Sequence, residues 1–182
     1  MKRLFDFTIS LIGLIVLFPI FIIVSVLVKI YSEGPVFFVQ KRIGKNGKVF
    51  QMIKFRSMYV IQSSDITISV KGDLRITKFG TFLRKYKIDE LPELFNVLRG
   101  DMSIVGPRPD VSGYADKLEG EAVLILELRP GITGPASLKY ANEEEILALQ
   151  KDPVKYNDEV IYPDKVKLNL DYYYNNNLWI DI

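Results

Sequence analysis

An apolar run near the N-terminus, Leu4–Ile30, constrains the fold of this 182-residue chain more than any other stretch. Its part from Leu11 to Val28 is as long as a helix that crosses the hydrocarbon core of a bilayer. The run is longer than the apolar region of a usual signal peptide, and no clear small-residue cleavage site follows it. A buried helix of a soluble protein is the other alternative, but a terminal helix that is apolar all round rarely finds enough protein to cover it. The sequence therefore predicts insertion into a membrane.

Pro19 lies in the middle of this run, where it removes a backbone hydrogen bond and kinks or breaks a helix. Basic residues flank the run on both sides, so the positive-inside rule does not assign the two flanks to opposite faces of the membrane. A helix–break–helix that enters and leaves on the cytoplasmic face accommodates both basic flanks. A kinked helix that spans the membrane is the alternative that the pattern leaves open.

Composition excludes several kinds of chemistry. The formal net charge of +2 is close to balance, so nucleic-acid binding through bulk charge is not expected. The chain contains no Cys and no His, which excludes disulfides, zinc–thiolate sites, thiol nucleophiles and the Ser-His-Asp triad. Any catalysis must therefore use carboxylates, Lys, Tyr, Ser or a metal ion.

Two adjacent carboxylates, Asp89 and Glu90, stand in the stretch Lys87–Pro109. Four apolar residues after them follow the spacing of one helix face that packs inward: Leu91, Leu94, Phe95 and Leu98. Asp89 occupies a helix N-cap position, Pro92 falls in the first turn, and Gly100 stands where the helix would end. We therefore predict a short helix whose positive N-terminal end holds both carboxylates and attracts phosphates.

A β-hairpin is predicted where β-branched and aromatic runs at 36–40 and 48–55 flank Gly44–Gly47, which contains an Asn-Gly pair. Lys54 and Arg56 alternate at the end of the second run, so both point to one face. One interpretation is that they are two solvated strand residues. The other is that at least one of them binds phosphate.

Two further arginines are candidates for binding phosphate. Prolines on both sides hold the backbone around Arg108 in a stiff, extended form, which suits a phosphate clamp. A structural ion pair of Arg108 with Asp101 or Asp110 is the alternative. Arg129 begins a turn-rich loop and is the second candidate.

Weaker patterns place the remaining elements. We expect a surface loop at 59–72, a strand at Met102–Val105, and helices at Thr77–Tyr86, 113–128, Glu143–Gln150 and Asp164–Asn175. The helix at Thr77–Tyr86 is basic and amphipathic, so it either presents a solvated face or lies on anionic lipid head groups.

The letters K-I-D-E-L-P-E-L-F-N-V-L-R-G-D-M-S-I-V-G-P-R-P at 87–109 resemble the central motif of the bacterial sugar transferase family, the monotopic phosphoglycosyl transferases. The likeness extends more loosely from the apolar N-terminus to R-P-G-I-T-G at 129–134. It implies transfer of a sugar-1-phosphate from a UDP-sugar to undecaprenyl (polyprenol) phosphate, the step that initiates a surface glycan. It also implies a re-entrant membrane hairpin, although the break usually carries Ser-Pro and here reads Phe18-Pro19.

On this resemblance we expect an α+β fold with a re-entrant membrane helix–break–helix at 1–32. A small, mainly helical cytoplasmic catalytic domain with a short β-hairpin follows at 33–182. The resemblance makes Asp89 the nucleophile, which forms a covalent aspartyl-phosphosugar intermediate, and Glu90 its essential partner. The expected phosphate-binding residues are Lys54, Arg56, Arg108 and Arg129. Mg²⁺ is the expected cofactor, held by Asp89 and Glu90, because it prefers oxygen ligands.

The expected partners are a UDP-sugar, polyprenol phosphate and lipid of the bacterial inner membrane, with the catalytic domain facing the cytoplasm and no nucleic acid. A homodimer is left open. Many family members carry G-x-A-Q-V-N-G-R where this chain has Gly134–Tyr140, so the identity of the sugar is also open. Two other functions stand beside transfer: a non-catalytic membrane-anchored module of polysaccharide assembly, and a nucleotide-sugar hydrolase.

Overall fold

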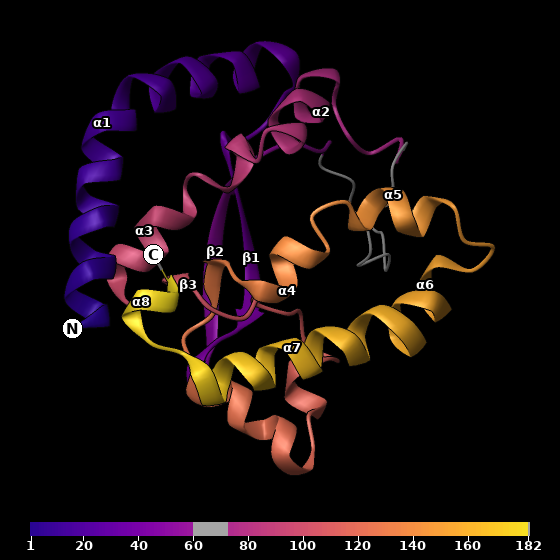
Figure 1. The fold of residues 1–182 in the computed structure, drawn as a ribbon. Helices are drawn as coiled ribbons and strands as arrows, with labels where there is room; N and C mark the ends of the chain where they lie inside the picture. Colours follow the sequence, from indigo (N-terminus) through magenta and orange to yellow (C-terminus); the bar gives the residue numbers. More distant parts are fainter. Residues whose placement is uncertain (60–72, 182) are drawn as a thin grey trace.

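The computed structural model describes residues 1–59 and 73–181 and combines helices with two small sheets, as the predicted α+β class requires (Figure 1). The predicted surface loop at 59–72 falls, apart from Tyr59, outside the described residues. The helices are α1 (Lys2–Tyr31), α2 (Lys78–Lys85), α3 (Glu93–Arg99), α4 (Pro135–Lys139), α5 (Glu143–Ala148), α6 (Pro153–Tyr156), α7 (Tyr162–Asn175) and α8 (Leu178–Asp181). The strands are β1 (Phe37–Ile43), β2 (Val49–Phe55), β3 (Ser103–Val105) and β4 (Gly131–Thr133).

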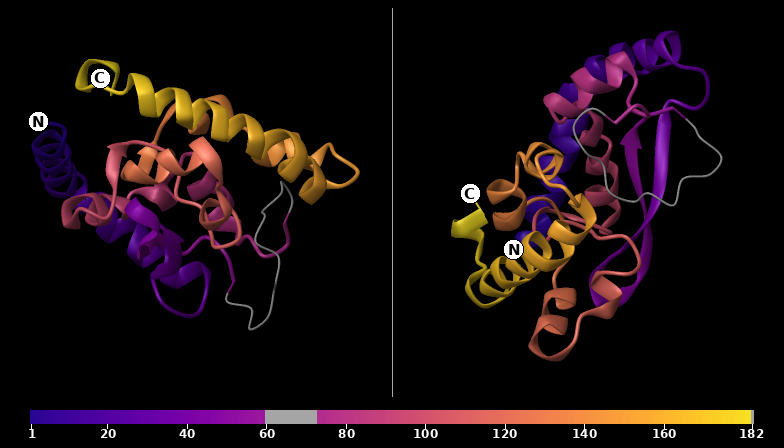
Figure 2. Two further views of the ribbon diagram at one scale, coloured as in Figure 1. Left: turned by 90° about the horizontal axis from the view of Figure 1, so that it is seen from below. Right: turned by 90° about the vertical axis from the view of Figure 1, so that its right-hand side faces the viewer.

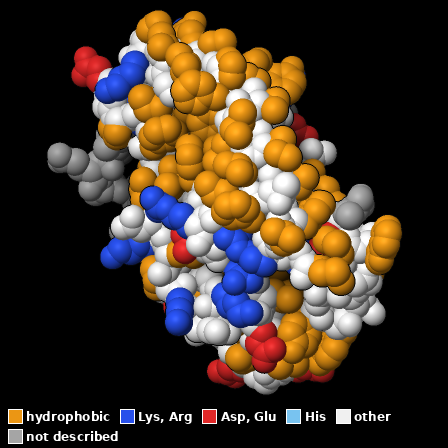
Figure 3. Space-filling view, turned by 90° about the vertical axis from the view of Figure 1, so that its left-hand side faces the viewer, with side chains coloured by type: hydrophobic (Ala, Val, Ile, Leu, Met, Phe, Trp, Pro, Cys, Tyr) orange, Lys and Arg blue, Asp and Glu red, His pale blue; other side chains and the backbone are white. Residues whose placement is uncertain are grey.

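The long helix α1 contains Pro19 and turns sharply part-way along its length (Figure 1). Proline removes a backbone donor and its ring crowds the preceding turn, which accounts for a bend in an otherwise continuous helix. Among the described residues, α1 alone is long and apolar enough to cross a membrane by length and composition. Its apolar side chains remain largely uncovered, with Ile15, Val16 and Ile30 each more than 60% exposed. Figure 3 shows an apolar surface on this side of the molecule, with Lys and Arg side chains below it.

The first turns of α1 are fixed to the rest of the chain. Asp6, which is 2% exposed, accepts hydrogen bonds from Ser103 Oγ (2.9 Å) and from the backbone N–H of Ile104 (3.1 Å). Arg3 donates to two carbonyls at the end of α3, at 2.5 and 2.8 Å. The N-terminal helix is therefore attached to α3 and β3 by polar contacts as well as by packing.

The predicted hairpin is confirmed. Strands β1 and β2 pair antiparallel from Phe37 opposite Phe55 to Ile43 opposite Val49. Asn46 (φ 56°) and Gly47 (φ 70°) adopt the left-handed conformation that an Asn-Gly turn supplies at little cost. The first strand continues to Ile43, three residues beyond the end that the sequence pattern indicated.

Helix α2 confirms the predicted helix at Thr77–Tyr86. Thr77 caps it, because its Oγ1 accepts the backbone N–H of Gly80 at 2.8 Å. Leu83 from α2 joins a buried cluster with residues of α1 and β2: Phe21, Val24, Val28 and Phe55. This cluster connects the second half of α1 to the hairpin, so the apolar helix forms part of the protein core as well as its surface.

The central stretch departs from the prediction at its start. Residues Ile88–Glu90 form a 3₁₀ turn, and α3 begins only at Glu93, so the predicted N-cap role of Asp89 is wrong. No side chain caps α3, which follows Pro92 directly. The predicted end is confirmed, since Gly100 adopts φ 93° at the C-cap.

The predicted apolar face of α3 packs against α1, but it is not the most buried face of the helix. Its most buried residues are Glu93, Asn96 and Val97, whereas Phe95 is 38% exposed. The apolar face turns toward α1, where the ring of Phe95 lies 5.8 Å from that of Phe21. The polar face instead meets β2, because the side chain of Asn96 bonds two backbone groups of that strand at 2.7 and 3.0 Å.

The later part of the chain crosses the side opposite the hairpin, as α7 does in Figure 2. Strands β3 and β4 pair in parallel, which confirms the strand predicted at Met102–Val105. The region 113–128 forms two 3₁₀ segments, Ala115–Lys117 and Gly120–Glu127, instead of the expected helix. Gly120, at φ 59°, begins the second segment. Helices α5 and α7 confirm the two predicted C-terminal helices, although α7 begins at Tyr162.

Candidate active site

A cavity of about 1490 Å³ is bounded by the hairpin, the 3₁₀ turn Ile88–Glu90, the loop after β3, and helices α4, α5 and α7. Five of the residues that the sequence singled out line it: Lys54, Arg56, Asp89, Glu90 and Arg108. Typical ligand pockets measure roughly 300–1,000 Å³, so this space can hold a ligand with several parts.

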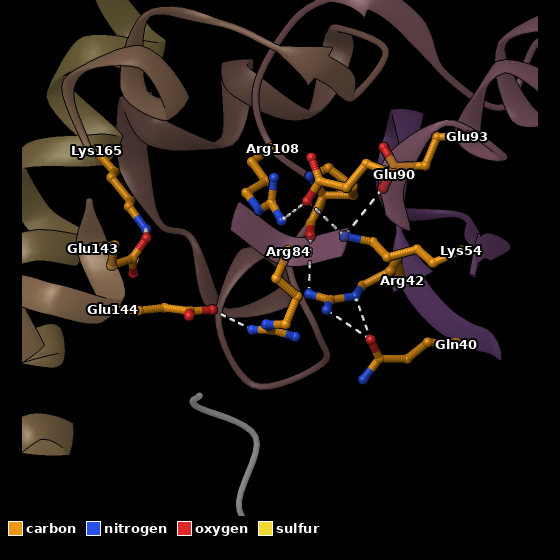
Figure 4. A network of polar contacts seen from close by, with 11 residues as sticks. Gln40, Arg42, Lys54, Arg84, Glu90, Glu93, Arg108, Glu143, Glu144 and Lys165 are labelled. Carbon is orange, nitrogen blue, oxygen red and sulfur yellow. Dashed lines mark hydrogen bonds and ion pairs between the residues drawn. The ribbon is translucent and has the colours of Figure 1, made fainter. Parts of the chain in front are cut away.

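An ion-pair network occupies one wall of the cavity (Figure 4). Glu90 Oε1 accepts hydrogen bonds from Lys54 Nζ at 2.9 Å and from an Arg108 guanidinium nitrogen at 2.6 Å. Lys54 Nζ also lies 3.1 Å from Glu93 Oε1. The Glu90 and Lys54 side chains are about one-tenth exposed, whereas that of Arg108 is 39% exposed. Part of the Arg108 side chain therefore stays exposed at the cavity.

The local structure explains why these groups meet. Glu90 and Glu93 are three residues apart across successive turns, so their side chains lie on the same side. Lys54 stands near the end of β2, which packs against both turns. Arg108 approaches from the loop after β3, between its two prolines.

Burial and charge act on these carboxyl groups in opposite directions. Burial raises the pKa of Glu90, but Arg108 and Lys54 outweigh it and hold that pKa well below the ordinary value. Burial raises the pKa of Glu93, and the attraction of Lys54 offsets only part of the increase. Glu90 is thus firmly ionised, while Glu93 takes up a proton more readily.

Asp89 is the carboxylate that the network leaves without a bond. It is 5% exposed, and its buried Oδ1 has no hydrogen-bond partner among the described residues. Burial raises its pKa, opposed chiefly by the positive charge of Lys54. Since α3 begins only at Glu93, Lys54 and not a helix N-terminus is the main group that favours the charged form of Asp89. An oxygen with uncommitted lone pairs at a cavity wall can attack an electrophile or bind a metal ion.

The guanidinium groups of Arg56 and Arg129 are held elsewhere. Arg56, which is 3% exposed, donates to the carbonyls of Ser32 and Glu33 at 2.7 and 2.6 Å, which fixes the end of α1. Arg129 Nε donates to the carbonyl of Gly100 at 3.0 Å. The structure brings Lys54 and Arg108 to the carboxylate pair, and a phosphate role for the other two arginines stays a prediction.

Sequence reasoning missed Glu93 and Arg42. The three-residue spacing of Glu90 and Glu93 was the available signal for the first, since it puts both on one side. Arg42 shares a face of the hairpin with Lys54, because Lys54 is paired with Phe38 and side chains alternate along a strand. Arg42 lines the cavity and donates to the Pro109 carbonyl at 3.1 Å; burial, reinforced by Arg108, lowers its pKa to about 10.

A magnesium ion fits the donor types at this wall. In the part of the chain that the structure describes, no group of three or more acidic residues could hold a metal ion. Mg²⁺ commonly takes only one or two carboxylates and completes its shell with water and substrate phosphates. The unpartnered Oδ1 of Asp89 and the carboxylate of Glu90 could supply those two ligands, so magnesium stays a prediction.

An ion-pair network lines a large cavity, and the uncovered apolar helix α1 indicates a membrane-associated protein. The family model described as "Bacterial sugar transferase" matches residues 1–182. The chain therefore belongs to the bacterial sugar transferase family.

Similar proteins carry names that describe one type of reaction. The chain is 41% identical to a UDP-glucose:undecaprenyl-phosphate glucose-1-phosphate transferase of Xanthomonas campestris pv. campestris, over all of this chain and 36% of that protein. It is 35% identical to a UDP-N-acetylgalactosamine-undecaprenyl-phosphate N-acetylgalactosaminephosphotransferase of Aeromonas hydrophila, over all of this chain and 41% of that protein. A putative undecaprenyl-phosphate N-acetylgalactosaminyl 1-phosphate transferase of Bacillus subtilis is 42% identical over 66% of this chain and 68% of its own. The chain thus spans well under half the length of the first two.

Proposed function

We propose that this chain is a phosphoglycosyl transferase that moves a sugar-1-phosphate from a UDP-sugar to undecaprenyl phosphate. The observation that carries the proposal is the unpartnered carboxylate of Asp89, beside a Glu90 that Lys54 and Arg108 hold ionised. The family, and the reactions named for relatives in Xanthomonas and Aeromonas, support the same reaction class.

Asp89 is the proposed nucleophile. One of its carboxylate oxygens attacks the phosphorus that bears the sugar, and the bond from that phosphorus to the uridine monophosphate oxygen breaks. UMP leaves with the bonding electrons, and an aspartyl-phosphosugar remains. A phosphate oxygen of the polyprenol phosphate then attacks the same phosphorus and releases the Asp89 carboxylate. The product is a polyprenyl diphosphate sugar.

The charged groups around Asp89 suit this two-step scheme. The accessible part of Arg108 and the ammonium of Lys54 can neutralise charge that develops on the phosphoryl oxygens. Mg²⁺, held by Asp89 and Glu90, would add further neutralisation of the diphosphate when bound. Full turnover in excess EDTA would contradict the magnesium requirement.

The apolar surface of α1 provides the route for the lipid acceptor. We infer that α1 enters the inner membrane as a re-entrant hairpin bent near Pro19, with the catalytic part in the cytoplasm. A polyprenol chain is itself apolar, so it reaches the cavity from the bilayer beside α1. Lipid of that membrane would cover the exposed side chains of Ile15, Val16 and Ile30.

The covalent intermediate provides the test. Incubation of the detergent-purified chain with its UDP-sugar and no acceptor should add one sugar-phosphate mass, mapped to the peptide that contains Asp89. Asp89→Asn should abolish both the adduct and turnover. Asp116→Asn changes an exposed carboxylate bound to Ser112 and is the matched control, with both signals retained.

Three outcomes would count against the proposal. Turnover without any adduct would indicate direct attack by the acceptor. Release of sugar phosphate to water without polyprenol phosphate would indicate a hydrolase. Intact polysaccharide assembly with Asp89→Asn would indicate a non-catalytic module.

A further inference from the structure

The cavity extends well beyond the ion-pair network. Its lining also contains three polar residues from different elements: Asp110 after β3, Ser137 in α4 and Asn169 in α7. Helices α4 and α7, which carry the last two, pack against each other. The mechanism above uses none of these three side chains.

Two of these side chains hold buried atoms without a partner. Ser137 Oγ and Asn169 Oδ1 are both shielded from solvent, and neither has a hydrogen-bond partner among the described residues. An unsatisfied buried polar group costs about 1–3 kcal/mol, and folded proteins contain few of them. Two such atoms on the wall of one cavity indicate a ligand that supplies hydrogen bonds there.

The lysine that lines this part of the cavity is already paired. Lys165 Nζ is bound to both carboxylate oxygens of Glu143 at 2.7 Å. Figure 4 shows the two side chains in contact. Lys165 therefore differs from Arg108, whose side chain stays 39% exposed.

The remaining groups are mainly acceptors. The Asp110 carboxylate and Asn169 Oδ1 accept hydrogen bonds, and Ser137 Oγ can either accept or donate. Each hydroxyl group of a sugar donates one hydrogen bond and can accept others, so a sugar ring satisfies such a wall. A uracil ring offers one N–H and two carbonyl oxygens, so it would need mainly donors.

Asp110 also lies close to the reacting groups. It follows Arg108 by two residues, which limits the separation of their Cα atoms to about 7 Å. The backbone carbonyl of Asp110 accepts the N–H of Ile43 at 2.9 Å, which fixes this loop against the hairpin. A sugar bonded to a phosphate at Arg108 would thus reach Asp110.

We propose that Asp110, Ser137 and Asn169 form the subsite that binds the hydroxyl groups of the donor's sugar ring and selects the sugar. This inference rests on the proposed function, since it assigns part of the same cavity. It makes these three side chains determinants of specificity, while the chemistry stays with Asp89 and its neighbours.

The test measures binding of UDP-sugars and of their deoxy analogues, each lacking one hexose hydroxyl, by calorimetry on the full chain in detergent. The wild-type protein should bind one analogue about tenfold more weakly than the parent UDP-sugar, a loss of about 1.4 kcal/mol. Asn169→Leu or Ser137→Ala should remove this difference. Asn169→Asp keeps an acceptor and should retain it, as should Asn175→Leu, a control at an exposed position of the same helix.

Two results would overturn the subsite. One is an unchanged preference for the hydroxyl in every variant. The other is a loss of preference only for the ribose hydroxyls, which is tested with a 2′-deoxyuridine donor. That result would show that these three residues bind the ribose and that the hexose binds at another place. Binding is measured without turnover. An inactive wild-type enzyme would therefore count against the proposed function. Variants that still distinguish the parent UDP-sugar from its deoxy analogue would count against the subsite alone.

Discussion

At the scale of one residue, Arg108 combines a structural ion pair with side-chain surface that stays exposed at the cavity. One guanidinium nitrogen binds Glu90 at 2.6 Å, while 39% of the side chain stays exposed to the cavity. Arg108→Lys should reduce kcat/KM by at least tenfold, because a single ammonium cannot hold Glu90 and a phosphate in the geometry of a planar fork. Steady-state kinetics measure the loss, with exposed Arg99→Lys as the control. Unchanged kinetics would leave Arg108 a purely structural role.

Lys54 is the single cation between two buried glutamates, so its removal should cost stability. Lys54→Met leaves Glu90 and Glu93 without this partner, and breaking a buried pair costs roughly 3–5 kcal/mol. Lys155→Met removes an ion pair whose two side chains are each 65% exposed and should cost at most about 1 kcal/mol. Thermal melting in detergent compares the two variants. Equal Tm values would show that Lys54 is not needed for folding.

Residue types predicted part of the site, and tertiary contacts decided the rest. The adjacent pair Asp89 and Glu90 could be predicted as catalytic because the chain lacks His and Cys, which leaves carboxylates among the few available catalytic groups. The sequence could not show that Arg56 would turn to the end of α1, because that contact joins residues 23 and 24 positions apart through their folded placement. Arg108 was predicted to bind phosphate, with an ion pair to Asp101 or Asp110 as the structural alternative, and the structure pairs it with Glu90 instead of either aspartate.

At the scale of an element, the close approach of β3 and β4 depends on glycine. A Cβ added at Gly106 would lie 2.4 Å from the Arg129 carbonyl, and one at Gly131 would lie 2.1 Å from the Gly106 nitrogen. This contact positions the loop that carries Arg108. Both neighbours are backbone atoms, so the clash has no flexible side chain to relieve it.

Gly106→Ala should therefore destabilise the protein by about 3 kcal/mol or more, since overpacking against backbone forces a main-chain shift. Gly120→Ala is the matched control: its site is open, and only its φ of 59° opposes a side chain, at about 1 kcal/mol. Purified yield and Tm measure both variants. A Gly106→Ala protein as stable as Gly120→Ala would show that the two strands can separate without cost.

Local patterns predicted the elements whose signals are local. The Asn-Gly pair predicted the hairpin turn correctly, and Thr77, the first residue of the predicted helix, caps α2. The apolar face of α3 packs against α1, whereas the sequence did not predict that the polar face would be the more buried one, against β2. A pattern within one helix does not report which neighbour each face will meet.

At the scale of the whole molecule, the bent α1 predicts that both its ends lie on one side of the membrane. The chain has no Cys, so Lys2→Cys and Lys45→Cys can each be labelled singly. An impermeant thiol reagent should reach both from the cytoplasmic side. Leu149→Cys, at a position 85% exposed in the globular part, reports the orientation of the vesicles. Labelling of the first two from opposite sides would show that α1 spans the membrane.

The anchoring of α1 also has a consequence for the order of events during synthesis. Asp6 bonds Ser103, which lies 97 residues later in the chain. At about 5–20 residues per second, a ribosome needs roughly 5–20 s to produce that partner after Asp6 has been made. During this interval the nascent helix carries a carboxyl group with no partner, and an acidic residue deep in a bilayer costs about 2.5–3.5 kcal/mol. If α1 enters the membrane as proposed, we therefore expect Asp6 to stay near the water boundary until translation delivers β3.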